Sequence, residues 1–162
     1  MKTNATRYLD SLGIQYQLLD YEVDPDDLSA VKVAARNGMP ARQVFKTLLA
    51  KGDRVEHLFA VIPGDLELDL KSLARASGNR SVELVPLNQL QQLTGYIRGG
   101  VTVFAAKRRF PAFIDSSSLS HPTIAVSAGV RGTQIQIAPA DYIRAAAAIT
   151  AELVRVKPKA ES

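Results

Sequence analysis

One lysine interrupts an otherwise apolar stretch of the sequence. Lys46 follows Val44 and Phe45 and precedes the run TLLA at positions 47–50. An ammonium buried without a partner costs several kcal/mol, so Lys46 either reaches the edge of its strand or points into a polar cleft. In a cleft it could stabilise negative charge that develops on a carbonyl or phosphate. Spacing alone favours an outward-facing lysine on the wet face of a strand, and both interpretations stay open at this point.

Two glycine-containing loops could contribute to the same cleft. Residues 95–100 read GYIRGG and are followed by Val101 and Thr102, and residues 127–132 read SAGVRG. Closely spaced glycines allow backbone N–H groups to approach a phosphate or a developing oxyanion. The same glycines could equally serve tight turns alone. The two loops therefore indicate a candidate cleft without establishing one.

Many familiar kinds of active site are excluded by the residue types present. The chain has no cysteine, and its two histidines, His57 and His121, stand apart without a zinc-binding motif. The phosphate-binding loop GxxxxGK[ST], the nucleophile elbow GxSxG and the dinucleotide fingerprint after a strand are all missing. We therefore expect neither a metal nor a cofactor.

The charge of the chain allows a polyanionic partner. Its 162 residues carry a net charge of +4, with a sequence pI near 9.5. The most basic run is 107–109, and two further arginines stand in the glycine-containing loops. A charge of +4 could also serve only to keep a small domain soluble. The candidate contacts to a nucleic acid are Arg98, Lys107, Arg108, Arg109 and Arg131.

These residues must be positioned by helices and strands that the periodicity of the sequence predicts. Helices are expected from an N-cap at Asn4 to Gly13, from Ser29 to Gly38, from Asp69 to Gly78, from Pro86 to Gly95, and from Pro139 through the alanines 145–148. Strands are expected around 14–18, 44–50, 58–62, 82–85, 101–104, 112–115, 123–127 and 133–137. This irregular order predicts a mixed α/β domain with a curved, barrel-like mixed sheet and peripheral helices.

Length and hydropathy predict one domain, residues 1–156, followed by a polar tail at 157–162. No apolar run reaches the ~20 residues that a membrane span needs, and the polar start lacks the apolar core of a signal peptide. We therefore expect no membrane contact and a cytoplasmic protein.

An ordered series of motifs resembles the YbaK/EbsC family over roughly residues 5–150 of the chain. The motifs are VFKTLL at 44–49, LDLK at 68–71, GY at 95–96 with GG at 99–100, FID at 113–115, and VS at 126–127 with Gly129 and RG at 131–132. The resemblance implies a mixed α/β fold related to the editing insertion of bacterial prolyl-tRNA synthetase.

The resemblance also implies an activity and a set of site residues. Family members act in trans on mischarged tRNA, cleaving the ester that joins a wrong amino acid to the tRNA terminus. The YbaK branch acts on Cys-tRNA(Pro), with prolyl-tRNA synthetase as a possible partner. The family's essential lysine falls on Lys46, the neighbouring threonine on Thr47, and the glycine loops on Gly99, Gly100 and Gly129. Such an ester is already activated, so neither a protein nucleophile nor a metal is strictly required.

Three departures from the family pattern leave the amino-acid specificity open. Thr102-Val103 stands where the YbaK branch has Ser-Pro, Ser127-Ala128-Gly129 stands where it has Ser-Gly-Gly, and Gln134 replaces an acidic residue expected near the pocket. We expect Thr102, Ser127 and Gln134 to contact substrate. The alternative to a deacylase is a noncatalytic tRNA-binding or regulatory module with the same fold.

Overall fold

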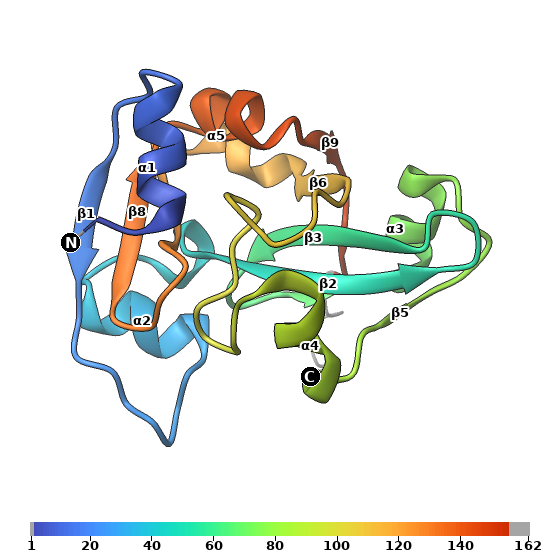
Figure 1. The fold of residues 1–162 in the computed structure, drawn as a ribbon, viewed down its shortest axis with the longest axis horizontal. Helices are drawn as coiled ribbons and strands as arrows, with labels where there is room; N and C mark the ends of the chain where they lie inside the picture. Colours follow the sequence, from blue (N-terminus) through green and yellow to red (C-terminus); the bar gives the residue numbers. More distant parts are fainter. Residues whose placement is uncertain (1, 156–162) are drawn as a thin grey trace, which may run out of the picture.

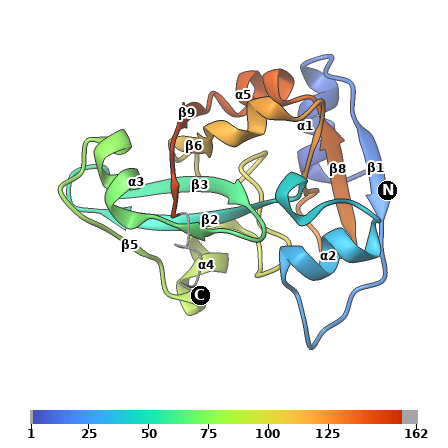
Figure 2. The same cartoon turned by 180° about the vertical axis from the view of Figure 1, so that it is seen from behind.

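Three β-sheets and five α-helices make up the fold, which the computed structural model describes for residues 2–155 (Figures 1 and 2). The predicted mixed α/β class is confirmed. The sheets do not close into a barrel. The predicted tail at 157–162 lies outside the described residues.

The largest sheet has five strands in the order β5-β2-β3-β6-β9. The strands are β2 (Phe45–Gly52), β3 (His57–Pro63), β5 (Val82–Leu84), β6 (Ala112–Asp115) and β9 (Ile149–Ala151). β2 pairs antiparallel with β3 and β5, whereas β6 is parallel to both β3 and β9. Because β5 pairs only with residues 50–52 of β2, the first half of β2 has an open edge.

A second, antiparallel sheet has the order β1-β8-β7, formed by β1 (Gln17–Asp20), β7 (Ile124–Ser127) and β8 (Thr133–Ile137). A parallel bridge between Val44 and Ala125 joins it to the start of β2. β4 (Glu67–Leu68) and β10 (Val154–Arg155) form a third sheet of two strands. The bridge brings the end of β7 toward the open edge of β2.

The helices are α1 (Asn4–Ser11), α2 (Ala30–Arg36), α3 (Leu70–Ser77), α4 (Leu87–Thr94) and α5 (Pro139–Ala146), with short 3-10 helices at Ala41–Gln43 and Ser116–Ser120. α3 and α4 cover opposite faces of the five-stranded sheet (Figures 1 and 2). The helix starts predicted at Ser29 and Asp69 are confirmed: both residues are N-caps whose side chains accept hydrogen bonds from the backbone of the first helical turn.

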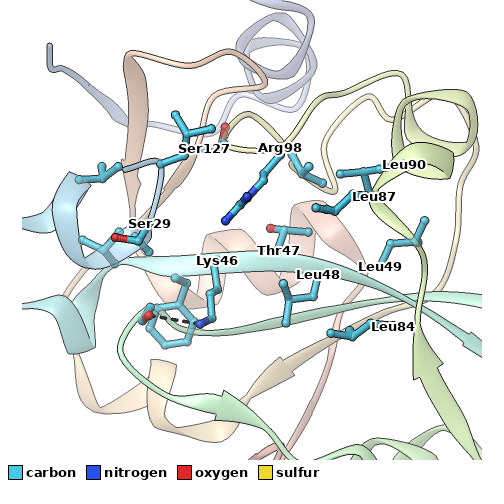
Figure 3. Close-up of a pocket in the computed structure, with 18 of the residues that line it drawn as sticks. Ser29, Lys46, Thr47, Leu48, Leu49, Leu84, Leu87, Leu90, Arg98 and Ser127 are labelled. Atoms are coloured by element: carbon cyan, nitrogen blue, oxygen red, sulfur yellow. Dashed lines mark hydrogen bonds between the residues drawn. The ribbon is translucent and has the colours of Figure 1, made fainter. Parts of the chain in front are cut away.

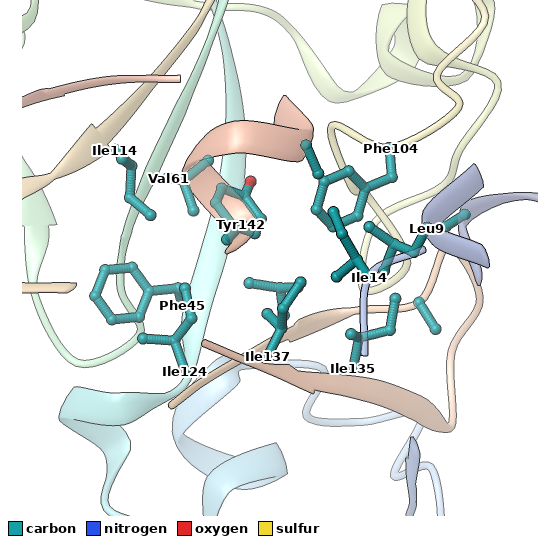
Figure 4. Close-up of a cluster of buried hydrophobic side chains, with 14 residues drawn as sticks. Leu9, Ile14, Phe45, Val61, Phe104, Ile114, Ile124, Ile135, Ile137 and Tyr142 are labelled. Atoms are coloured by element: carbon teal, nitrogen blue, oxygen red, sulfur yellow. The ribbon is translucent and has the colours of Figure 1, made fainter. Parts of the chain in front are cut away.

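The main core holds the two larger sheets together (Figure 4). Phe45 and Val61 of the five-stranded sheet pack with Ile124 and Ile135 of the smaller sheet, and Tyr142 of α5 is buried in the same cluster. Burial of this apolar surface stabilises the arrangement and fixes one sheet relative to the other. The open edge of β2 and the end of β7 are thus positioned by a common core.

Four predicted elements are wrong in detail. The strand expected around 14–18 lies further along the chain, at Gln17–Asp20. Residues 101–104 form no strand: the Thr102 hydroxyl accepts from the Phe104 N–H at 3.4 Å, and the Phe104 carbonyl accepts from the Tyr96 hydroxyl at 2.6 Å. The first helix is capped by Thr3, which forms a reciprocal capping box with Thr6, and not by Asn4. The last helix ends at Ala146 because the next residue has a left-handed backbone, and Ile149–Ala151 then joins the sheet.

Candidate functional site

A pocket of about 350 Å³ lies over the open edge of β2 (Figure 3). α2, β5, α4 and the two glycine-containing loops supply residues to its lining. Six of the residues singled out from the sequence line it, namely Lys46, Thr47, Arg98, Gly99, Ser127 and Gln134. The fold therefore brings together residues that are up to 88 positions apart, from position 46 to position 134.

Lys46 is half-buried in this pocket and its ammonium donates to the carbonyl of Gly64 at 3.3 Å (Figure 3). Burial lowers the pKa of Lys46, because it removes water from the charged form; the carboxylates of Asp65 and Glu67 oppose this effect. A lysine ammonium has three donors, so one long hydrogen bond leaves it able to bind another acceptor. Lys46 is thus neither an outward-facing surface lysine nor a fully buried one.

The carbonyl that holds Lys46 is fixed by a tightly packed turn after β3. The Gly64 N–H donates to the Val44 carbonyl at 2.7 Å. A Cβ atom at position 64 would lie only 2.4 Å from the Ala30 Cβ and 2.7 Å from the Val44 carbonyl oxygen. Because no side chain fits there, glycine is required for this close approach of α2, β2 and the turn.

Thr47 offers both a side chain and a stretch of backbone to the pocket. The Val44 carbonyl accepts from Gly64 and the Gly52 N–H donates to Glu56, so both point to the side of β2 on which β3 lies. The Leu49 carbonyl accepts from Val85 on the opposite side of β2. Alternation along the strand then directs the N–H and carbonyl of Thr47 toward the open edge. The Thr47 hydroxyl is buried and has no hydrogen-bond partner within residues 2–155.

Ser127 and Gln134 form a neutral wall across the pocket from β2. They face each other in the β7–β8 pairing and are 8% and 5% exposed, respectively. The Ser127 hydroxyl accepts from the Gly129 N–H at 3.1 Å. The side-chain amide oxygen of Gln134 is buried and has no hydrogen-bond partner in the described part of the chain. A buried acceptor without a partner costs free energy, so this wall is suited to a ligand that donates a hydrogen bond.

The two glycine-containing loops converge mainly on each other. Arg131 donates from Nε to the Arg98 carbonyl at 2.8 Å, and Gly100 packs against the backbone of Val130. Gly129 has φ +92° and lies against the ring of Tyr96. Gly99 lines the pocket, whereas Gly100, Gly129 and the fully buried Thr102 lie outside its lining. In this structure the last three serve loop packing, and their place in substrate binding stays a prediction.

The candidate nucleic-acid contacts separate into two groups. Arg98 extends into the pocket toward the space between Ser29 and Thr47 (Figure 3). The run 107–109 is exposed outside the lining, and the Lys107 N–H donates to the Thr94 carbonyl at 2.8 Å, at the end of α4. Arg131 is also exposed. Positive charge therefore lies both inside the pocket and beside α4.

Sequence reasoning missed several lining residues. Ser29 was expected only as the start of a helix. Gly64 was not singled out, although Pro63-Gly64-Asp65 after an apolar strand is a turn signal. Five leucines at one end of the pocket were also missed, because their spacing in the sequence is the same whether they face the core or a pocket. They are Leu48, Leu49, Leu84, Leu87 and Leu90.

Residues 2–155 contain neither a cluster of metal-ligating side chains nor a membrane-spanning helix. No three His, Cys, Asp or Glu side chains come together there as a possible metal site. Within the same residues, no helix is long and apolar enough to cross a membrane.

Comparison with known proteins gives consistent matches over most of the chain. Residues 24–145 match the family described as the aminoacyl-tRNA editing domain. EbsC of Enterococcus faecalis, a proposed Cys-tRNA(Pro)/Cys-tRNA(Cys) deacylase, is 43% identical over 138 residues, which cover 85% of this chain and 84% of EbsC. YwhH of Bacillus subtilis, whose function is uncharacterised, is 24% identical over 118 residues, or 73% of this chain and 74% of YwhH.

Two crystal structures show the same fold. The hypothetical protein APE2540 has a TM-score of 0.86 and 24% identity, with 94% of this chain and 100% of that chain covered. A proposed trans-editing enzyme for prolyl-tRNA synthetase has a TM-score of 0.82 and 21% identity, with 96% and 99% covered. At these identities the likeness concerns the fold alone.

Proposed function

The chain belongs to the aminoacyl-tRNA editing family of YbaK/EbsC proteins, and from this premise we propose that it is a deacylase acting in trans on mischarged tRNA. Its substrate is the ester between a wrong amino acid and the terminal ribose, with Cys-tRNA(Pro) the first candidate because of the identity to EbsC. The observation that carries the proposal is the half-buried, incompletely bonded ammonium of Lys46 in a pocket at an open strand edge.

In the proposed reaction, Lys46 and the edge of β2 stabilise charge that develops on the ester. Water or a group of the substrate attacks the ester carbonyl, whose oxygen becomes negative. As the ester bond breaks, the carbonyl re-forms and the ribose oxygen leaves with the proton that the attacking group has lost. The Lys46 ammonium donates to that carbonyl oxygen or to the phosphate of the terminal nucleotide. The Thr47 N–H, directed toward the open edge, is a second donor for the oxyanion.

The neutral wall is proposed to bind the amino acid. A substrate α-ammonium needs acceptors, and the Gln134 carbonyl oxygen, the Thr47 hydroxyl and the Ser127 hydroxyl are available at the pocket. Replacing a carboxylate with a neutral amide changes how strongly each amino acid is held. We therefore infer that selectivity depends on Gln134.

The proposed reaction indicates which cofactors and partners the protein requires. An activated ester can be cleaved by orientation and oxyanion stabilisation, so we infer that turnover needs no metal and no cofactor. The partner is mischarged tRNA, with prolyl-tRNA synthetase as a candidate for delivering it. Since translation supplies this substrate in the cytoplasm, we infer that the protein works there.

The test is a deacylation assay with cysteinyl-, alanyl- and prolyl-tRNA, with and without excess chelator. We expect turnover of at least one mischarged tRNA, unaffected by the chelator as long as the tRNA stays folded. Tight tRNA binding without any turnover would identify the noncatalytic module instead. Loss of turnover that added zinc restores would contradict the metal-independent reaction.

A further inference from the structure

One end of the pocket is an apolar rim that the proposed reaction does not use. Leu84 of β5 and Leu87 of α4 line the pocket, yet they are 50% and 63% exposed. Leu90 and Val85, each 8% exposed, anchor them to the sheet below. Exposed apolar side chains that continue a pocket wall mark a binding surface more often than scattered surface leucines do. We call Leu84 and Leu87 the leucine rim.

The position of the rim limits what can lie on it. Figure 3 shows Lys46 and Thr47 between the rim on one side and Ser127 and Ser29 on the other. An ester bound at Lys46 has two arms, the amino acid with its ammonium and the terminal adenosine with its planar base. The ammonium arm needs acceptors and fits the wall of Ser127 and Gln134. The arm left for the leucine rim is the adenosine.

Charge beside α4 favours an RNA strand at this end. α4 begins at Leu87 and ends at Thr94, whose carbonyl accepts from the Lys107 N–H, so the exposed run 107–109 starts beside the far end of the helix. An eight-residue helix is about 12 Å long. Stacked nucleotides rise about 3.4 Å each, so a single-stranded end of a few nucleotides can span this length.

We propose that the leucine rim binds the base of the terminal adenosine and that the run 107–109 binds the phosphates of the nucleotides before it. This inference rests on the proposed function, since it assumes an aminoacyl ester at Lys46. Aliphatic side chains bind a base by covering its apolar faces, whereas the cations act through charge and therefore depend on salt.

The rim is tested with a stable amide analogue, 3′-aminoacylamino-3′-deoxyadenosine, and with the same compound lacking the base. In the variant Leu84→Ser/Leu87→Ser, we expect affinity for the adenosine analogue to fall about tenfold. Affinity for the base-free compound should not change. Leu119→Ser is the matched control, because Leu119 is 59% exposed and lies outside the pocket. Equal affinity of the rim variant and the control, or equal losses for both compounds, would overturn the proposal.

The cationic run is tested with the analogue extended by two cytidines at its 5′ side. Replacing all three residues of 107–109 with alanine should weaken binding of the extended analogue and lower its salt slope by roughly 0.7 for each phosphate that is no longer neutralised. The single-nucleoside analogue should bind unchanged. Alanine replacement of Lys71, Arg75 and Arg80, exposed cations on or just after α3, is the control. An unchanged slope in the 107–109 variant overturns this half of the inference.

Failure of the leucine-rim proposal can be distinguished from failure of the proposed function. If the wild-type protein hydrolyses mischarged tRNA and the rim variant keeps full affinity for the adenosine analogue, only the rim assignment is wrong. If the wild type neither hydrolyses any ester nor binds any analogue, both are wrong.

Discussion

The wall that β2 contributes to the pocket differs in kind from the wall that β7 and β8 contribute. On β2, Lys46 carries a charge, is half-buried and has two carboxylates near enough to affect its pKa. Across the pocket, Ser127 and Gln134 are neutral and at least nine-tenths buried. One core cluster fixes both walls, so the difference lies in the side chains and not in rigidity.

This difference separates two tasks of the proposed enzyme. A charged group that keeps partial access to water can act on the ester, which every aminoacyl-tRNA has in common. Buried neutral groups discriminate, because a substrate that leaves them without a hydrogen bond is penalised. Changes to Lys46 should therefore reduce turnover of all substrates, and changes to Ser127 or Gln134 should alter the order in which substrates are preferred.

The largest effect is expected from Lys46→Ala. Removing one donor to a developing oxyanion typically costs about 10²- to 10³-fold in rate, and this loss should be similar for every ester. Lys46→Arg should recover only part of the lost rate, because a planar guanidinium directs its donors differently from an ammonium. Single-turnover deacylation, measured beside thermal unfolding, checks this.

Lys51→Ala is the control for Lys46, since Lys51 is an exposed lysine on the same strand. We expect its turnover and melting temperature to match the wild type. A folded Lys46→Ala protein with full activity would remove the central role assigned to this lysine.

The next effect is expected from Gly64→Ala, which disturbs the turn that holds Lys46. A Cβ here meets Ala30 and the Val44 carbonyl, so stability should fall by about 1 to 3 kcal/mol. Displacing the Gly64 carbonyl misplaces the ammonium, and a shift of about 1 Å can cost up to a hundredfold in rate. Denaturant unfolding and single-turnover rates measure the two effects separately.

Ala30→Gly added to Gly64→Ala tests the cause of that loss. It removes the contact at 2.4 Å but leaves the contact with the Val44 carbonyl at 2.7 Å, so part of the stability and turnover should return. If the double variant recovers stability but no turnover, the Gly64 carbonyl does not position Lys46.

The sequence was sufficient to predict most elements and to single out Lys46, which the structure places in the pocket lining. Lys46 stands out because an ammonium in an apolar run either reaches the edge of its strand or points into a polar cleft, although spacing alone favoured an outward-facing lysine. Asp69 and Ser29 cap helices through contacts within one turn, which local sequence encodes. Such features need no knowledge of distant residues.

The features that could not be predicted depend on distant contacts. Thr102 is in an apolar run that looks like a strand, but it is buried in a loop. Ile149–Ala151 becomes a strand only because β6 offers it a parallel partner. The approach of Gly64 to Lys46 depends on α2 packing against the turn, 34 positions after Ala30 in the chain. Tertiary contacts decide each of these.

A smaller and more selective effect is expected from Gln134→Asp on the neutral wall. A carboxylate there would hold a substrate ammonium more strongly, and relative rates for cysteinyl, alanyl and prolyl esters should change by about tenfold. Turnover of the best ester should stay within the range of the wild type. Gln136→Asp is the control, because Gln136 lies outside the pocket and donates to Thr123. Identical preferences in both variants and the wild type would rule out a selective role for Gln134.

The smallest effect is expected from Asp65→Asn, which should shift the pH dependence of turnover through its effect on Lys46. Lys46 carries its charge below its pKa, so turnover that needs the ammonium is lost as pH rises through that pKa. Burial lowers the pKa of Lys46 and the Asp65 carboxylate opposes the lowering. Asp65→Asn removes that opposing charge. The pKa should then fall further, and the alkaline loss of activity should begin at a lower pH.

Arg42→Ala separates this effect from loss of an ion pair, since Arg42 Nε lies 3.1 Å from an Asp65 carboxylate oxygen. That variant breaks the pair but keeps the carboxylate, so its alkaline limb should stay in place or move to higher pH. Single-turnover rates over the pH range in which the ester survives, corrected for uncatalysed hydrolysis, compare the two variants. Because the pair is partly exposed, breaking it should cost little stability in either variant. Equal shifts in both variants would assign the effect to the structure of the turn, and no shift in Asp65→Asn would show that the charge of Lys46 does not limit the rate.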